Sequence, residues 1–272
     1  MQLPPHPLLA GLIKHYLILE TYEDLPLNYR LFSDGNPGIV FHYKNPLTQY
    51  DGNRTVRSIQ PKSFIYGQIS HYNDLTGNGK LGMLIVVLQP DGIYSLLGMP
   101  AMELNNSIVQ LSDLFGQKGA ELEEKVIGGA STEKKIEWIE KFFIKKSAFV
   151  KDPDPAFKES LFEIYKQQGL VTIRELLAKI PITERQLERK FKEYIGRPPK
   201  QFSDTIKFQY FLKRLQTQAG SKKISDIIYD SGYYDPSHLN NYFKKMAGFT
   251  PLQYKSGHLR LANNFMQLSQ TK

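Results

Sequence analysis

Cysteine is absent from the 272 residues, and this absence excludes several classes of function at once. Without a thiol, the chain has no disulfide, no cysteine-ligated metal site and no cysteine nucleophile. Long apolar runs are also missing: the longest, at residues 83–88, has six residues, whereas a membrane-spanning helix needs about 20. The first ten residues lack the basic start and apolar stretch of a signal peptide. We therefore expect a cytoplasmic protein without a membrane partner.

Motifs for catalysis and metal binding are scarce in the first half of the chain. It contains no Gly-x-Ser-x-Gly elbow and no phosphate-binding loop, and residues 77–80 (Gly-Asn-Gly-Lys) are too short to hold a nucleotide and predict a hairpin turn. His6, His15, His42 and His71 have neither the i, i+4 nor the His-x-His spacing of shared metal ligands. We expect no enzyme, no metal and no cofactor.

The first half instead has the pattern of strands and turns. Apolar segments at 39–43, 63–66 and 83–88 are separated by turns rich in Gly and Asn, so we expect a β-rich domain built as a barrel or a sandwich. A helix follows at 132–146, and its apolar stripe is expected to pack within the same domain. The stripe consists of Ile136, Ile139, Phe142 and Phe143.

The length suggests two domains. A stretch rich in Asp and Pro around residues 151–155 interrupts helical periodicity and marks the boundary. We expect an α+β protein of four segments. They are a sensory or assembly domain at 1–147, a linker at 148–155, an all-helical domain at 156–260 and a C-terminal tail at 261–272.

A repeat between Ile173 and Tyr254 is the most informative pattern. Each half predicts a short amphipathic helix, a turn, a longer helix and a Gly-x-x-Pro-x-x-aromatic exit. Six positions recur 52 residues later, and they include turn residues as well as core residues, which unrelated helices would not share. The pairs are Leu187 and Leu239, Phe191 and Phe243, Lys192 and Lys244, Gly196 and Gly248, Pro199 and Pro251, and Phe202 and Tyr254.

Local signals define the ends of the longer helix in both halves. Thr183 is expected to cap the first helix, with Gln186 returning the hydrogen bond. Asp235 is expected to cap the second, with Pro236 at the first helical position. The repeated glycines then predict the C-terminal caps. Both longer helices should therefore begin and end at equivalent points.

The outward faces of the longer helices carry polar and basic side chains. At about 100° per residue, the apolar positions fall on one face and a trio of polar residues on the opposite face. This is the plan of a helix-turn-helix unit, whose second helix enters the DNA major groove, where Arg reads guanine, Asn or Gln reads adenine and Lys neutralises phosphate. The trios are Arg185, Arg189 and Lys192, and Ser237, Asn241 and Lys244.

Charge is distributed unevenly along the chain. Residues 156–272 contain 20 Lys and Arg against 10 Asp and Glu, whereas residues 1–155 contain 15 against 17. The whole basic excess therefore lies with the repeat. This distribution is typical of a nucleic-acid-binding module attached to a nearly neutral second module.

Six stretches of the second half resemble the AraC/XylS family of bacterial transcription regulators, and the resemblance covers about the last hundred residues. The order and spacing of two units make it specific. The stretches are Val171–Leu177, Thr183–Lys192, Gly196–Pro199, Ile224–Ile228, Gly232–Lys244 and Gly248–Pro251.

The resemblance implies two helix-turn-helix units joined by a long helix, for which residues 201–216 are suited, and an N-terminal sensor domain that is often cupin-like. The sequence departs from the family pattern at three positions: Leu177 and Ile228 stand where Ala is common, and Asn241 stands where Arg is frequent. We therefore expect the first unit to supply most of the DNA affinity. Carried over by motif position, the base-facing residues are Arg185, Gln186, Glu188 and Arg189 in the first unit and Ser237, His238, Asn240 and Asn241 in the second, with Lys192 and Lys244 on phosphates.

The function expected from these patterns is sequence-specific transcription regulation. Double-stranded DNA is the expected partner, while the effector of the N-terminal domain, a homodimer and contact with RNA polymerase are left open. Two alternatives also stay open, a sequence-indifferent DNA-binding protein and a small-molecule binding protein or enzyme with a helical protein-interaction module. Activation and repression are not distinguished by the sequence.

Overall fold

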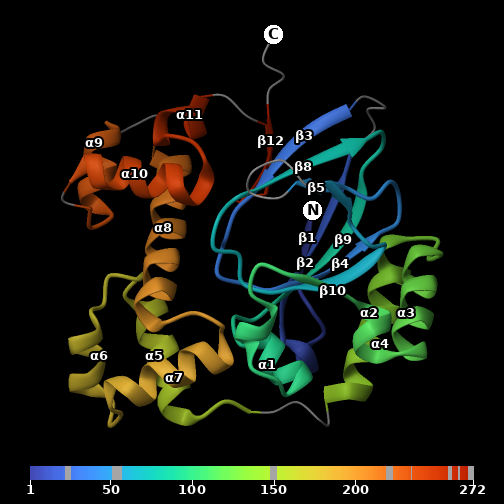
Figure 1. Ribbon diagram of the computed structural model, residues 1–272, viewed down its shortest axis with the longest axis horizontal. Helices are drawn as coiled ribbons and strands as arrows, with labels where there is room; N and C mark the ends of the chain where they lie inside the picture. The colour runs from blue at the N-terminus through green and yellow to red at the C-terminus, as the bar shows by residue number, and fades with distance from the viewer. Residues whose placement is uncertain are drawn as a thin grey trace.

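The computed structural model contains a sandwich of two β-sheets, with helices over one outer side of it and a column of helices along the other (Figure 1). Within the described part of the chain, no helix is both long and apolar enough to span a membrane. The structure describes residues 1–21, 26–50, 57–147, 152–218, 223–233, 235–256, 259–262 and 264–268.

The first sheet is antiparallel, with the strand order β1-β2-β9-β4-β7-β10. Its central strand β9 buries both faces: Leu84 and Val86 pack toward the N-terminal helices, whereas Met83 and Val87 pack toward the second sheet. Consecutive apolar residues are needed for this, which explains the run at 83–88. The strands are β1 (Gln2–Leu3), β2 (Ile13–Glu20), β4 (Gly38–His42), β7 (Ser63–Tyr66), β9 (Gly82–Leu88) and β10 (Ile108–Gln110).

The second sheet is also antiparallel, with the order β11-β12-β3-β8-β5-β6. The two sheets enclose a shared apolar core that includes Leu17, Phe64 and Leu75. The expected β-rich domain is thus confirmed, and the described strands form a sandwich and no closed barrel. The strands are β3 (Pro26–Leu31), β5 (Thr48–Tyr50), β6 (Arg57–Ile59), β8 (Asn73–Asn78), β11 (Leu259–Ala262) and β12 (Phe265–Gln267).

The turn at residues 77–80 differs from the expected hairpin. It connects β8 to β9, and these strands lie in different sheets, so the chain crosses the sandwich there. Gly79 adopts φ 94°, which only glycine adopts readily. The Gly-Asn-Gly pattern predicted a tight turn correctly, but the sheet that each flanking strand joins depends on distant partners.

Helices of the N-terminal domain cover the outer face of the first sheet. Helix α4 packs on it through Ile139 and Phe143, both fully buried, which confirms the expected packing of its stripe within the domain. The elements are α1 (Gly92–Leu97), α2 (Leu111–Phe115), α3 (Gln117–Ile127), α4 (Thr132–Ser147) and the 3-10 segments η1 (Pro7–Leu9) and η2 (Ala101–Leu104).

The C-terminal helices form two similar units around the long helix α8. The first unit has a core that includes Phe191 and Phe202, and the second has a core that includes Phe243 and Tyr254, the residues at the same repeat positions. The helices are α5 (Pro155–Lys166), α6 (Ile173–Lys179), α7 (Glu184–Tyr194), α8 (Pro199–Gln218), α9 (Ile224–Asp230), α10 (Pro236–Ala247) and α11 (Pro251–Ser256).

Part of the segment that we expected to be a tail, 261–272, belongs to the second sheet. The hairpin β11–β12 follows α11, and β12 pairs antiparallel with β3 near the start of the chain. Residues 269–272 lie outside the described residues. The C-terminal end of the described chain therefore completes a sheet of the N-terminal sandwich.

Candidate nucleic-acid interface and internal cavity

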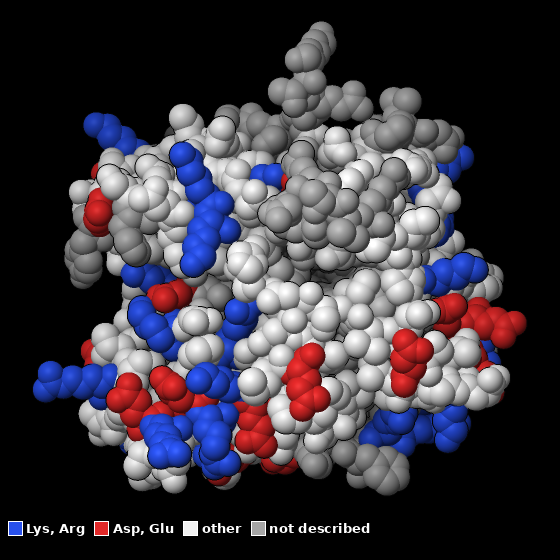
Figure 2. Space-filling model, viewed as in Figure 1, with Lys and Arg blue, Asp and Glu red and all other residues white. Residues whose placement is uncertain are grey.

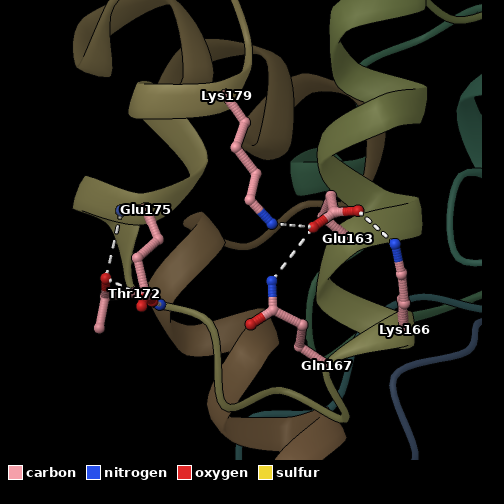
Figure 3. Close-up of polar contacts among 6 residues, drawn as sticks. All are labelled: Glu163, Lys166, Gln167, Thr172, Glu175 and Lys179. Carbon is pink, nitrogen blue, oxygen red and sulfur yellow. Dashed lines mark hydrogen bonds and ion pairs between the residues drawn. The ribbon is translucent and has the colours of Figure 1, made fainter.

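The two helices of the first unit both begin at capping boxes. Thr172 accepts a hydrogen bond from the Glu175 amide at 3.2 Å, and the Glu175 carboxylate accepts one from the Thr172 amide at 2.8 Å (Figure 3). This hydrogen bond from the Thr172 backbone is the main reason why the pKa of Glu175 is lowered. Thr183 and Gln186 repeat the arrangement at the start of α7, as the sequence predicts. Two backbone donors are satisfied at each start.

Polar contacts tie α6 to α5. The Glu163 carboxylate of α5 accepts hydrogen bonds from Lys179 at 2.7 Å and from Gln167 at 3.1 Å, and it lies 3.5 Å from Lys166 (Figure 3). The hydrogen bond from Lys179 is the main cause of the lowered pKa of Glu163. Because Lys179 is the last residue of α6, the contact holds the end of the helix that precedes the turn into α7.

Helix α7 buries one face and presents the other to solvent. Leu187, Phe191 and Tyr194 lie in the core of the first unit. All five side chains proposed for this helix are exposed. The side-chain oxygen of Gln186 (Oε1) accepts the hydrogen bond of the capping box, and Glu188 lies 3.6 Å from Lys192. The five are Arg185, Gln186, Glu188, Arg189 and Lys192.

Helix α10 presents the equivalent face of the second unit. The Asp235 carboxylate accepts a hydrogen bond from the Ser237 amide at 2.8 Å, and Pro236 occupies the first turn, as expected. Leu239 and Phe243 are fully buried. The described candidates on the opposite face are all exposed, while the side chain of His238 lies outside the described residues. They are Ser237, Asn240, Asn241 and Lys244.

Lys and Arg side chains gather where Figure 1 draws α5, α6 and α7, and further basic side chains lie over the second unit (Figure 2). Acidic side chains are interspersed with those of the first unit, so the surface is mixed and not uniformly positive. The exposed cations of the proposed face of α7 are Arg185, Arg189 and Lys192. The described surface therefore presents exposed cations and side-chain amides, the groups with which proteins bond phosphates and bases.

Both longer helices end at a glycine that the N-terminal domain contacts. The side-chain amide of Asn105 donates a hydrogen bond to the Gly196 carbonyl at 2.6 Å, and the Arg30 guanidinium donates one to the Gly248 carbonyl at 3.2 Å. Gly196 and Gly248 have φ of 90° and 71°, as expected for caps. A β-carbon at Gly196 would lie 2.5 Å from the side-chain oxygen of Asn105 (Oδ1). Each glycine is thus favoured by its backbone conformation, and each lies in contact with the N-terminal domain.

A cavity of about 560 Å³ lies between the sheets and extends to α5 and α8. Such a volume is in the range of small-molecule sites. Much of its wall is apolar and comes from the sandwich, including Val40, Phe64 and Val87. Lys14 of β2 and Lys213 of α8 also line it. The cavity therefore contacts both halves of the chain.

The sequence predicted the exposed faces of α7 and α10 but gave no signal for the cavity or for the glycine contacts. Asn105 lies in a loop 91 residues before its partner, and Arg30 lies in a strand 218 residues before Gly248. Alternating apolar residues indicate that a strand has a buried face. They do not indicate that space between two sheets remains unfilled.

Two families match the chain. Residues 1–110 match a domain of unknown function (DUF6597), and residues 176–257 match a helix-turn-helix domain. Among curated proteins, no match was found.

Solved structures of similar fold include ToxT from Vibrio cholerae, which is 16% identical, with 88% of this chain and 97% of ToxT covered and a TM-score of 0.50. ToxT with a bound unsaturated fatty acid is 13% identical, with coverage of 88% and 94% and a TM-score of 0.47. The AraC-like transcriptional activator CuxR is 15% identical, with coverage of 78% and 80% and a TM-score of 0.29. Residues 176–257 therefore form a helix-turn-helix domain, and this match supports the resemblance of the C-terminal half to the AraC/XylS family of transcription regulators.

Proposed function

We propose that the protein regulates transcription by binding a specific DNA sequence with both helix-turn-helix units. The observation that carries this proposal is the equivalent presentation of α7 and α10, which are capped at both ends, buried on one face and polar on the other. Two such helices in one chain suit successive major-groove segments about 34 Å apart. The expected target is therefore a bipartite site.

The two faces differ in the bases that they favour. Arg185 and Arg189 on α7 have the fork that bonds guanine at O6 and N7, whereas Asn240 and Asn241 on α10 have the amides that bond adenine at N6 and N7. We expect a guanine contact in the half-site read by α7 and an adenine contact in the half-site read by α10. The additional cations of α7 give the first unit the larger share of affinity.

Arg189→Ala tests this assignment. Selection of bound duplexes from a random pool should yield a bipartite site with the full-length protein, and the variant should lose about 1 to 3 kcal/mol of binding free energy and relax one base position. Lys118→Ala is the matched control, because Lys118 is an exposed cation on α3, in the other domain. Unchanged affinity and unchanged base preference in Arg189→Ala would exclude α7 as a reading helix. Equal binding to every duplex in the pool would indicate a sequence-indifferent protein.

The cavity is the proposed effector site. Its apolar wall between the sheets suits an apolar body, and Lys14 and Lys213 provide positive charge for an anionic head group, although Asp34 also lines the cavity. The ligand class is an amphipathic carboxylate, which includes fatty acids such as the unsaturated one recorded with ToxT. A ligand bound here would contact the sandwich and helix α8 together.

Hexadecanoate is a suitable probe for this site. It should raise the Tm of the full-length protein, because a ligand that binds only the folded state stabilises it. The Lys14→Gln/Lys213→Gln double variant should require a higher ligand concentration for the same shift, and Lys118→Gln should behave like the wild type. No shift with hexadecanoate in the wild type would remove this effector class from the proposal.

A further inference from the structure

Strand β12 connects the end of the second helix-turn-helix unit to the N-terminal sandwich. It follows α11 in the chain and pairs with β3, with Phe265 opposite Leu31 and Met266 opposite Arg30 (Figure 1). Further hydrogen bonds extend the pairing, since the Phe32 amide donates to the Asn264 carbonyl at 3.0 Å. The second unit is therefore attached to the sandwich by a strand as well as through α8.

The inner face of the β3–β12 pair forms a wall of the cavity. Side chains of a strand alternate between its two faces. Leu31 of β3 and its partner Phe265 of β12 both line the cavity, and Phe265 stacks on Tyr29 with ring centroids 5.3 Å apart. A ligand in the cavity would therefore touch side chains of both strands.

The outer face of the same pair packs into the second unit. Met266 is fully buried in that unit's core, and Phe32, the residue after β3, lies edge-to-face with Phe208 and Tyr254 at centroid distances of 6.1 and 6.4 Å. Met266 follows Phe265 in sequence and Phe32 follows Leu31, so each is next to a residue that lines the cavity. The antiparallel pair of β3 and β12, which we call the β3–β12 ribbon, thus forms part of the cavity wall with one face and part of the core of the second unit with the other.

Arg30 adds a polar contact on this outer face. Its guanidinium forms two hydrogen bonds with the Asp74 carboxylate, at 2.6 and 2.9 Å, and bonds the Gly248 carbonyl at the end of α10. It also lies over the Phe249 ring at 4.6 Å from the centroid. The ribbon therefore contacts α10 directly as well as the core beneath it.

We propose that the β3–β12 ribbon couples occupancy of the cavity to the orientation of the second reading helix, α10. This inference rests on the proposed effector site. A ligand that presses on Phe265 acts on the strand backbone, because this side chain is buried and stacked on Tyr29 and has little room to yield by itself. The same strand carries Met266, which pairs with Arg30 of β3, so the core of the second unit and the end of α10 shift with it. The size of the effect is bounded by the ligand's difference in affinity between the two arrangements.

Met266→Ala changes the face of the ribbon that packs into the second unit and leaves the side chains that line the cavity unchanged. The experiment measures the Kd of full-length protein for a bipartite duplex without and with saturating hexadecanoate. In the wild type we expect the ligand to change the Kd by about tenfold, within the usual range of coupling. The variant should bind hexadecanoate within about threefold of the wild type, because its side chain faces away from the cavity, while the ligand's effect on DNA binding falls below about threefold.

Ile59→Ala is the matched control, since Ile59 is 71% exposed on β6, at the other edge of the same sheet. It should retain the wild-type coupling. If Met266→Ala binds DNA and hexadecanoate, and hexadecanoate still changes the Kd for DNA as much as in the wild type, the ribbon inference is wrong. The DNA-binding and effector proposals would then still stand. Failure of the wild type to bind hexadecanoate would overturn the effector proposal and the inference together.

Hydrogen exchange of the wild type provides a second measurement if Met266→Ala does not fold. Hexadecanoate should change amide protection in residues 264–268 and in α10, with no change in α3, which lies on the outer side of the first sheet. Unchanged protection in both 264–268 and α10, with the ligand bound, would overturn the inference.

Discussion

His42, one of the four histidines of the first half that lack metal-ligand spacing, is part of the buried core. The residue is 1% exposed, and its Nε2 lies 3.1 Å from the side-chain oxygen of Gln60 (Oε1). Its Nδ1 has no hydrogen-bond partner among the described residues. Burial lowers its pKa to about 4. A neutral ring that donates from Nε2 to Gln60 fits this environment, whereas a second proton, on Nδ1, would make the ring cationic and leave an unpaired charge in the core. The described residues contain no group of three or more possible metal ligands.

The lowered pKa of His42 predicts a pH-dependent stability. The unfolded ring titrates near pH 6.5 and the folded ring near pH 4, so the unfolded state binds more protons between these values. The stabilisation is therefore present above pH 6.5 and is lost as the pH falls toward 4. Between pH 7.5 and 5 the loss should be about 2 kcal/mol.

Urea unfolding of the wild type and His42→Gln at both pH values measures this contribution. The variant should lose about 2 kcal/mol less than the wild type between pH 7.5 and 5, because the amide does not titrate. His71→Gln is the control, since His71 is exposed. Identical pH dependence in His42→Gln and the wild type would show that His42 does not become buried in its neutral form.

At the scale of elements, the capping box of α7 should contribute measurably to stability. Thr183→Ala removes the side-chain acceptor of the Gln186 amide, and loss of such a cap costs about 1 kcal/mol. Thr217→Ala is a matched control, because the Thr217 hydroxyl bonds the Lys213 carbonyl within α8, a contact that slightly disfavours helix. Circular dichroism during urea unfolding measures both variants. Equal stability of the two would contradict the role of the cap.

Elements with local signals were predictable from sequence, and elements with distant partners were not. The caps at Thr183 and Asp235 and the glycine at 248 depend on neighbours within four residues, so their patterns were sufficient. Strand β12 has only three residues, and its existence depends on β3, more than 200 positions earlier. No periodicity can be recognised in three residues. The cavity is equally nonlocal, because it depends on how two complete sheets are spaced.

At the scale of the whole molecule, the N-terminal domain contacts the chain at the C-terminal ends of both α7 and α10, at the same repeat position. Asn105 bonds Gly196 and Arg30 bonds Gly248, and the rings of Tyr94 and Tyr194 lie 4.4 Å apart in the same interface. These contacts fix each unit against a common body. Under the proposed function, the spacing of the two half-sites on DNA would therefore be set by the whole chain and not by α8 alone.

The charge asymmetry of the molecule predicts the salt dependence of DNA binding. The basic excess lies in residues 156–272, and neutralisation of about six phosphates would give log K a slope near −5 against log salt. Each phosphate contact contributes about 0.9 to that slope. A Lys192→Ala/Lys244→Ala double variant should therefore have a slope less steep by about 2, because these exposed lysines of α7 and α10 are the two that we assign to phosphates.

Fluorescence anisotropy with one duplex between 50 and 300 mM salt, on the order of the physiological range, measures these slopes. A Lys118→Ala/Lys125→Ala double variant is the matched control, since it removes the same charge from α3 of the other domain. The control should keep the wild-type slope, because α3 carries none of the proposed phosphate contacts. A slope that responds equally to both double variants would mean that net charge, and not the exposed faces of α7 and α10, governs binding. A wild-type slope near zero would contradict the electrostatic contribution to DNA binding altogether.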